Sequence, residues 1–466
     1  MTHLIIWNSF GTDTAPIRPL GAHQLGTWLS QFNYNVKIID FCNLMTTEEL
    51  VKITEKYITD ETISIGASTT FWKDRDSELK VFGEPAWALQ ARDKIENMYP
   101  NLKWILGGWQ TSKDYQTKEW IKFDGHGEDS VLKFLDNHTK YVLTRQKFDI
   151  QSLNKHYLDD LHITPTEVLP MEMSRGCQFK CSFCRYPLIG KKKGTYLRDL
   201  KLIREELILN YERYGTTRYS IVDDTVNEDD DKIKGLADIA QSLPFKLEWI
   251  GYLRLDLIGS RRHTISMLKD SGLVSAFFGI ESFHKDASKI VGKGWNGIYA
   301  KDFLIELKHL WNNSISFQLG LIVGLPGETE NHLHQTLKWC IENNIDNWTF
   351  SPLHIDIGDK RPYKSNFDIN YANYGYSFPN PNDNEFWIND NWTRASAIKV
   401  SRQLTQISRD HMKVGTWHGA NLASLGYSFT DLYNSKIKNL DYNLFYRQTK
   451  TFVNEYVRKE LANVAQ

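Results

Sequence analysis

The sequence predicts an α/β protein with an N-terminal doubly wound parallel sheet, a partial (β/α)6 barrel and a mostly helical C-terminal region. Short apolar runs alternate with helical patterns over residues 1–145, and the same alternation returns over residues 166–360. The texture then changes to an Asn-, Tyr- and Pro-rich loop followed by helices. The chain has 466 residues, 41% of them hydrophobic and 24% charged, which is enough for about three folded domains.

The charge balance points to neither a nucleic-acid partner nor an acidic membrane. Lys and Arg number 56 against 57 Asp and Glu, and the run Lys191-Lys192-Lys193 is interpreted as a solvated loop. The chain has no stretch of about 18 uncharged apolar residues and no signal-peptide pattern at its N-terminus. We therefore expect a soluble cytoplasmic protein.

The first domain, residues 1–145, is expected to contain a parallel sheet. Its predicted strands are Leu4–Trp7, Val36–Ile39, Ile63–Ile65 and Trp104–Leu106. A helical pattern covers Leu20–Phe32, between the first two strands. Gly107 and Gly108 close the fourth strand, where glycines let the backbone approach a ligand or simply connect a strand to a helix.

The second domain, residues 166–360, follows a predicted linker over residues 146–165. Its strand-like runs are Glu167–Met173, Tyr219–Val222, Leu247–Tyr252, Ala276–Ile280, Phe317–Val323 and Trp348–Leu353. Six βα units in series predict an open, partial barrel whose chemistry lies at the C-terminal strand ends. Residues 361–466 form the C-terminal region, with helices predicted near 392–411 and 443–463, the last of them with an apolar stripe suited to core packing.

Three of the five cysteines follow the first predicted barrel strand directly. Cys177, Cys181 and Cys184 have the spacing Cys-x3-Cys-x2-Cys, which suits metal ligation in a reducing compartment better than a disulfide framework. Three thiolates on one loop can each hold one iron of a cubane cluster and leave the fourth iron open to a small molecule. Structural zinc is the alternative, but no nearby Cys or His supplies a fourth ligand. We therefore expect a 4Fe-4S cluster here.

This cysteine motif resembles the signature of the radical S-adenosylmethionine (SAM) superfamily, including the aromatic residue before the third cysteine, Phe183. The resemblance implies that the amino and carboxylate groups of SAM chelate the open iron. It also implies that one electron, from a donor such as flavodoxin or ferredoxin, releases a 5'-deoxyadenosyl radical that abstracts a hydrogen atom from the substrate. The cofactor supplies this chemistry, and the protein orients it and excludes water.

Two further segments resemble the superfamily in their order and strand position. The segment Gly279–Ser282 ends the fourth barrel strand and looks like the one that contacts the ribose and methionine parts of SAM. The segment Gly324–Thr329 follows the fifth strand and resembles the glycine-rich turn on the adenine side, in which Glu328 is a candidate cap for the next helix. The residues assigned to the cofactor on this basis are Glu281, Ser282, Gly324 and Gly327.

Asp223, Asp224 and Arg254 occupy strand ends where members of the superfamily touch cofactor or substrate. The adjacent carboxylates would accept hydrogen bonds from the ammonium of bound methionine, or alternatively form an Asx turn. His354, beyond the sixth strand, is a candidate substrate contact or a structural histidine. Cys340 is either a hydrogen-atom donor, which would favour epimerisation, or a small buried apolar residue.

Residues 1–145 resemble the cobalamin-binding-domain branch of the superfamily. The matching landmarks are Pro19-Leu20-Gly21, Asp40, Gly107-Gly108 and Gly127-Glu128-Asp129. The resemblance implies that cobalamin binds with its tail near Gly107 and Gly108 and its corrin ring facing the barrel. The chain lacks an Asp-x-His-x-x-Gly cobalt-ligating motif, as members of this branch usually do, and its loop Asn8–Thr12 lacks the paired prolines common in the branch.

The leading hypothesis is a cobalamin-dependent radical methyltransferase acting on an unactivated carbon of a small molecule or peptide. Cobalamin would carry a methyl group from one SAM to a carbon radical made by a second SAM. The first alternative keeps the fold but not the cobalamin and performs plain hydrogen abstraction, for example an epimerisation or cyclisation. The second alternative is a non-catalytic cobalamin or cluster sensor, against which the two cofactor-side segments argue.

Overall fold

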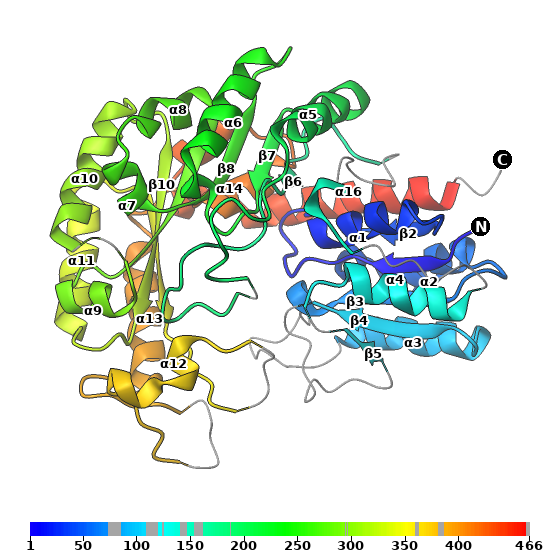
Figure 1. The fold of residues 1–466 in the computed structure, drawn as a ribbon, viewed down its shortest axis with the longest axis horizontal. Helices are drawn as coiled ribbons and strands as arrows, with labels where there is room; N and C mark the ends of the chain where they lie inside the picture. The colour runs from blue at the N-terminus through cyan, green and yellow to red at the C-terminus, as the bar shows by residue number, and fades with distance from the viewer. Residues whose placement is uncertain are drawn as a thin grey trace.

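Two parallel β-sheets organise the chain (Figure 1). The computed structural model describes residues 1–72, 85–108, 120–123, 125–139, 147–152, 162–186, 188–293, 295, 297–358, 363–380 and 386–462. Every strand predicted from the sequence is present, and the predicted fold class is confirmed. The predicted linker, residues 146–165, lies only partly within the described residues. No helix of the described residues is long and apolar enough to cross a membrane.

The first sheet has the order β2-β1-β3-β4-β5, and all its pairings are parallel. Its strands are β1 (Leu4–Trp7), β2 (Val36–Ile39), β3 (Ser64–Ser68), β4 (Lys103–Gly107) and β5 (Ile121–Lys122). Its helices are α1 (Leu20–Ser30), α2 (Thr47–Tyr57), α3 (Ala86–Met98) and α4 (Glu128–His138). Because successive strand side chains point to opposite faces, Leu4 and Ile6 pack with α1 and α4, whereas Ile5 and Trp7 pack with α2 and α3.

The second sheet is open, with the strand order β11-β10-β9-β8-β7-β6 and parallel pairing throughout. Its strands are β6 (Leu169–Met171), β7 (Arg218–Ile221), β8 (Glu248–Leu253), β9 (Leu273–Glu281), β10 (Ser316–Val323) and β11 (Asn347–Pro352). The helices between them are α5 (Leu200–Tyr214), α6 (Asp230–Ser242), α7 (Leu255–Ser260), α8 (Thr264–Asp270), α9 (Lys285–Ile290), α10 (Gly297–Leu310) and α11 (Glu330–Glu342). The near-continuous apolar strands form one large core with these helices.

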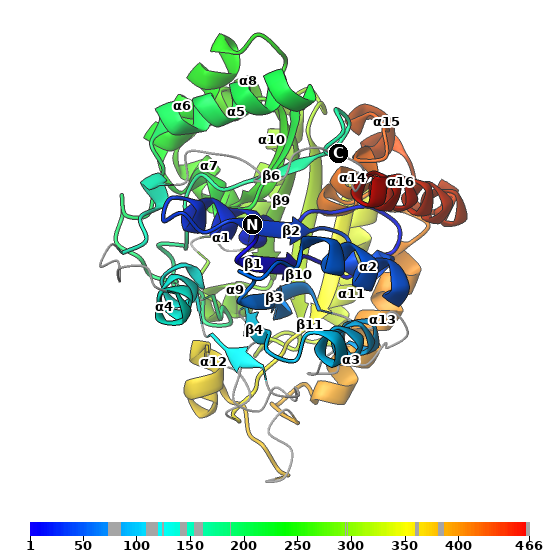
Figure 2. The same ribbon diagram turned by 90° about the vertical axis from the view of Figure 1, so that its right-hand side faces the viewer.

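The helices of the C-terminal region pack against both sheets. Its helices are α12 (Asn366–Ile369), α13 (Arg394–Ser408), α14 (Thr416–Ala423), α15 (Phe429–Asn434) and α16 (Tyr442–Ala462). Helices α14 and α15 pack around Ile250 on the inner face of the second sheet. Helix α16 instead returns to the first domain and lies beside α2 in both views (Figures 1 and 2). Val453, Tyr456 and Val457 enter the core that contains Trp7, so the predicted apolar stripe does pack in a core, that of the first sheet.

A buried ion network joins the first domain to the start of the second sheet. The guanidinium of Arg18 donates to Asp40 at 2.5 Å and to Glu167 at 2.6 Å, and all three side chains are almost fully buried. Burial lowers the pKa of Arg18, but the two carboxylates together raise it by a larger amount. The net pKa of Arg18 is therefore above its ordinary value. This arrangement fixes the position of the first domain against the residues that lead into β6.

Candidate functional site

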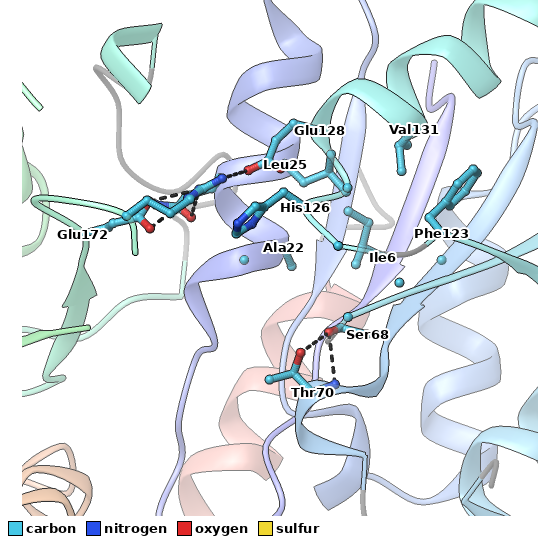
Figure 3. Close-up of a pocket in the computed structure, with 18 of the residues that line it drawn as sticks. Ile6, Ala22, Leu25, Ser68, Thr70, Phe123, His126, Glu128, Val131 and Glu172 are labelled. Atoms are coloured by element: carbon cyan, nitrogen blue, oxygen red, sulfur yellow. Dashed lines mark hydrogen bonds and ion pairs between the residues drawn. The ribbon is translucent and has the colours of Figure 1, made fainter. Parts of the chain in front are cut away.

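A pocket of about 340 Å³ lies between the first sheet and the residues that follow strands β6 and β7 of the second sheet (Figure 3). Its inner part is apolar and lies between the first sheet and helices α1 and α4. The residues of this apolar slot are Leu4, Ile6, Leu25, Ile105, Phe123 and Val131. On the barrel side the pocket is lined by Glu172, Ser174, Arg175, Gly176, Tyr186, Leu188, Val222 and Asp224. One pocket therefore touches both domains.

The two glycines predicted to approach a ligand, Gly107 and Gly108, both line this pocket. A Cβ on Gly107 would meet nothing within 4 Å, so the space beside it is open. Gly108 has a φ of +106°, and its Cβ would lie 2.7 Å from Oγ1 of Thr69. The chain therefore needs glycine at position 108 for its own backbone, and glycine at 107 keeps the pocket free.

His126 also lines the pocket and points into it between Ala22 and Glu172 (Figure 3). It makes no hydrogen bond or ion pair with the described residues. Burial, and after it the charge of Arg175, lowers the pKa of His126, which favours the uncharged imidazole. Sequence reasoning missed this histidine, because a residue between two glycines carries no signal of such a placement.

The cysteine loop is held by backbone hydrogen bonds on both of its sides. The amide of Cys177 donates to the carbonyl of Leu188 at 2.9 Å, and the amide of Cys184 donates to the carbonyl of Cys181 at 3.0 Å. Gly176 has a φ of +78°, and its Cβ would lie 2.5 Å from Cβ of Leu188, so glycine is required there. Ser182 ties the middle of the loop to the end of α9 through bonds to Val291 and Ile290.

The three thiols are free of disulfide bonds. Burial raises the pKa of Cys177 and raises that of Cys184 to about 12, and the charges of Asp224 and Cys181 act in the same direction on both. The described residues contain no group of three or more Cys, His, Asp or Glu that converges on a single metal ion. A cubane cluster does not need such convergence, because each thiolate binds a different iron. The donor set therefore fits a cluster with one iron left open.

Arg254 lies against this loop. Its Nη1 donates to Sγ of Cys181 at 3.4 Å, and its guanidinium carbon is 3.9 Å from the ring centroid of Phe179. Phe183, in contrast, is partly buried against the core of the second sheet. The structure thus brings Arg254 directly to a predicted cluster ligand.

The adjacent carboxylates have different surroundings. Asp223 accepts hydrogen bonds from the amide of Met173 at 2.8 Å, from Oγ of Ser174 at 2.8 Å and from Nζ of Lys232 at 2.5 Å. Asp224 lines the pocket, and burial followed by the charge of Asp223 raises its pKa to about 7. The two carboxylates therefore do not form a free pair: Asp223 anchors the strand before the cysteine loop, and Asp224 alone faces the pocket.

The fourth strand of the second sheet ends in a strained turn. Glu281 has a φ of +65°, and its carboxylate pairs with Nζ of Lys293 at 3.2 Å. A Cβ on Gly279 would lie 2.6 Å from Oε1 of Glu281, so the missing side chain lets the carboxylate fold back over the strand. A non-glycine residue in the left-handed region is uncommon and marks an over-determined site.

The segment after the fifth strand is joined to this turn. Oγ of Ser282 donates to Oε1 of Glu328 at 2.6 Å, and burial raises the pKa of Glu328 to about 8. Glu328 does not cap the next helix: Thr329 does so, in a capping box with His332. Sequence position alone did not show which of Glu328 and Thr329 caps the helix, because the buried partner of Glu328, Ser282, comes from the end of a different strand.

The two glycines of this segment have different neighbours. Gly324 has a φ of +107°, and its Cβ would lie 2.6 Å from the ring of Trp387, so it is needed for packing. Gly327 has a φ of +76°, and its Cβ would meet nothing closer than 3.6 Å. Space beside the backbone, which the cofactor prediction requires, is therefore present at Gly327.

The remaining candidates have structural surroundings. Nδ1 of His354 lies 3.3 Å from Nη1 of Arg185, and Arg185 also forms an ion pair with Asp368. Cys340 is fully buried in the core of the second sheet, as expected for a small apolar residue.

The chain is similar to known proteins in sequence and in fold. The family model of the radical SAM superfamily matches residues 171–340. The chain is 23% identical over 363 residues to an uncharacterised methyltransferase of Pyrococcus horikoshii, an alignment that covers 70% of this chain and 74% of that one. It is 23% identical over 194 residues to bacteriochlorophyllide d C-12(1)-methyltransferase of Chlorobaculum tepidum, which covers 40% of each chain.

Two solved structures share the fold over nearly the whole chain. The radical SAM methyltransferase TsrM from Kitasatospora setae, with cobalamin and a 4Fe-4S cluster bound, superposes with a TM-score of 0.63 at 12% identity and covers 97% of this chain and 100% of that one. The cobalamin-dependent SAM radical enzyme OxsB, with aqua-cobalamin and SAM bound, gives a TM-score of 0.57 at 12% identity and covers 100% and 81%. Residues 171–340 therefore form a domain of the radical SAM superfamily, and the chain as a whole has the fold of TsrM and OxsB.

Proposed function

We propose that the chain is a cobalamin-dependent radical SAM methyltransferase that acts on an unactivated carbon. The observation that carries this proposal is the shared pocket, because Gly107 at the edge of the first sheet and Asp224 beside the cysteine loop line the same space. When bound, the cluster and SAM supply the 5'-deoxyadenosyl radical, and cobalamin supplies the carrier of the methyl group.

In this proposal the first domain holds cobalamin. The apolar slot suits the uncharged aromatic end of the cobalamin tail, and the open space beside Gly107 admits it. The ligands of doubly wound sheets lie outside the carboxyl ends of the strands, as this pocket does. His126 lines the same pocket and would offer bound cobalamin a hydrogen-bonding group, and its lowered pKa favours the neutral imidazole, which avoids the cost of burying a charge.

The second domain holds the cluster and SAM in this proposal. Cys177, Cys181 and Cys184 ligate three irons, and the space beside Gly327 receives the adenine side of SAM. Glu281, held by Lys293, and Ser282, held by Glu328, present polar groups to SAM from the strained turn.

We propose an aromatic cluster as the substrate side of the site. The ring centroid of Tyr252 lies 4.7 Å from that of Trp417 and 5.0 Å from that of Phe277, and all three side chains are only partly buried. Burial and the charge of Asp224 raise the pKa of Tyr252 to about 12, so its hydroxyl stays a hydrogen-bond donor. We place the substrate, a small molecule or peptide, between these rings and Asp224.

The test starts with anaerobic reconstitution of the chain with iron and sulfide. We expect about four iron and four sulfide per chain, and loss of the cluster when Cys177, Cys181 and Cys184 are replaced by Ala, with Cys340→Ala as the control. Protein mixed with hydroxocobalamin should keep a corrinoid absorption spectrum after desalting. With substrate, S-adenosylhomocysteine and 5'-deoxyadenosine should form in comparable amounts. If no corrinoid is retained and only 5'-deoxyadenosine forms, the cobalamin-free alternative replaces the methyltransferase.

A further inference from the structure

Arg254 is held in a fixed position beside the cysteine loop. Arg254 follows β8 directly and is the N-cap of α7. The side chain of Asn227 clamps both of its backbone groups: Oδ1 accepts from the Arg254 amide at 2.9 Å, and Nδ2 donates to the Arg254 carbonyl at 2.9 Å. Asn227 is itself buried, so the Cα of Arg254 has a fixed place.

The guanidinium of Arg254 is fixed as firmly as its backbone. Its Nε donates to Oδ1 of Asp256 at 3.0 Å and its Nη2 donates to Oδ2 at 2.7 Å, which is the two-pronged geometry that suits Arg and carboxylate. The ring of Phe179 lies against it, with 3.9 Å from the guanidinium carbon to the ring centroid. The remaining nitrogen, Nη1, is left facing Sγ of Cys181 at 3.4 Å.

The other hydrogen-bonding neighbours of the cluster cysteines are uncharged: the Thr225 side chain and the Phe179 backbone at Cys177, and the Tyr186 backbone at Cys184. Oγ1 of Thr225 lies 3.4 Å from Sγ of Cys177 and 2.8 Å from the carbonyl of Asp224, and its hydroxyl carries no charge. Among the hydrogen bonds of the described residues, Arg254 is thus the charged donor to a ligand sulfur.

We infer that Arg254 sets the reduction potential of the 4Fe-4S cluster by donating a charge-assisted hydrogen bond to the Cys181 thiolate. This inference rests on the proposed function, because it requires the cluster on the three cysteines. Reduction adds one electron from a low-potential donor such as reduced flavodoxin or ferredoxin to the cluster, and no bond at Arg254 forms or breaks. The added negative charge interacts more favourably with a nearby cation and a hydrogen-bond donor, so Arg254 favours the reduced state.

The surroundings keep Arg254 charged. An arginine guanidinium stays protonated in proteins, and the ion pair with Asp256 at 2.7 Å favours the charged form. The side chain is only 7% exposed, so water screens its charge weakly. Arg254 is therefore a positioning and tuning residue, because it acts through Cys181.

The experiment is a potentiometric titration of the reconstituted holoprotein without SAM, followed by the electron paramagnetic resonance signal of the reduced cluster. Arg254→Gln removes the charge and Arg254→Lys keeps it while losing the fixed fork. We expect both midpoint potentials to be more negative than that of the wild type, with the larger shift for Arg254→Gln. Thr225→Val is the matched control and should shift the potential less than either variant.

The outcomes are separable. Unchanged potentials in Arg254→Gln and Arg254→Lys, measured on protein with the wild-type iron content, overturn the inference and leave the proposed function intact. Failure of both variants to assemble a cluster that the wild type assembles also overturns it, because Arg254 would then be needed for assembly rather than for tuning. Failure of the wild type to assemble a cluster contradicts the proposed function itself.

Discussion

Arg175, two residues before Cys177, donates a hydrogen bond through Nη1 to Oε1 of Glu128 on the first turn of α4 at 2.7 Å. The same guanidinium pairs with Glu172 at 3.0 Å and has Oε1 of Gln24 as a further acceptor at 3.2 Å. One buried cation therefore connects the cysteine loop to two helices of the first domain, at the wall of the shared pocket. The relative position of the two proposed cofactors depends on it.

Replacing Arg175 by Met should destabilise the chain strongly. The change leaves the buried carboxylate of Glu128 and the partly buried carboxylate of Glu172 without their cation, and breaking a buried pair costs about 3 kcal/mol of unfolding free energy. Urea denaturation of wild type and variant measures the loss. Glu128→Gln is the matched control and should cost less, because the amide oxygen still accepts from Arg175. A loss under about 1 kcal/mol in Arg175→Met would show that the ion pair does not hold the domains together.

Replacing Gly327 by Leu should weaken SAM binding while leaving the cluster spectrum intact. The space beside Gly327 would be filled, and a non-glycine residue at its φ of +76° is strained. Gly375→Leu is the matched control, because Gly375 has a φ of +79° and has nothing within 4 Å of its Cβ position. Both variants should lose a similar amount of unfolding free energy, and only Gly327→Leu should raise the dissociation constant for SAM. Equal SAM affinity in the two variants would remove Gly327 from the site.

The strands and the cysteine motif were predictable because their signals are local. The apolar run Leu4–Trp7 and the Cys-x3-Cys-x2-Cys spacing are each contained in a few residues. The return of α16 to the first domain was not predictable in this way. Lys37 pairs with Glu460 at 2.9 Å, and no periodicity in either segment indicates that residues 423 positions apart meet.

The roles of neighbouring polar residues were equally hidden. Asp223 and Asp224 are adjacent in the sequence, yet Asp223 accepts a hydrogen bond from Lys232, whereas Asp224 lines the pocket. His126 enters the pocket because the turn before α4 faces the barrel, which depends on how the two domains pack. Such assignments depend on tertiary contacts. The tertiary contacts, and not the local sequence pattern, decide which groups become partners.

Replacing Gly107 by Val should block corrinoid binding without unfolding the first domain. Its Cβ position is open, so the added methyl groups would extend into the pocket rather than into the core. Retention of hydroxocobalamin after desalting should fall, while the far-ultraviolet circular dichroism and the cluster content stay as in the wild type. His126→Ala enlarges the pocket instead and should weaken corrinoid binding through loss of a contact. Full retention by Gly107→Val would place the corrinoid elsewhere.

Glu328 should make the stability of the chain depend on pH. Its pKa is raised from 4.5 to about 8 in the folded chain, mainly by burial, so the folded state holds a proton that the unfolded state has lost. The resulting stabilisation is fully present below pH 4.5 and is lost as the pH rises through about 8. A tenfold change in an acid dissociation constant corresponds to about 1.4 kcal/mol, so the total effect is on the order of a few kcal/mol.

Glu328→Gln isolates this effect, because the amide keeps an acceptor for Ser282 and does not ionise. The unfolding free energy of the variant relative to the wild type should rise between pH 5 and pH 8.5, as denaturation curves at several pH values would show. Glu330→Gln, an exposed residue two positions further along the chain, is the matched control and should give a nearly constant difference. A constant difference for Glu328→Gln as well would mean that Glu328 is ionised in the folded chain. In that case Ser282 donates to a carboxylate, and the contact between the two SAM-side segments is a charge-assisted hydrogen bond at neutral pH.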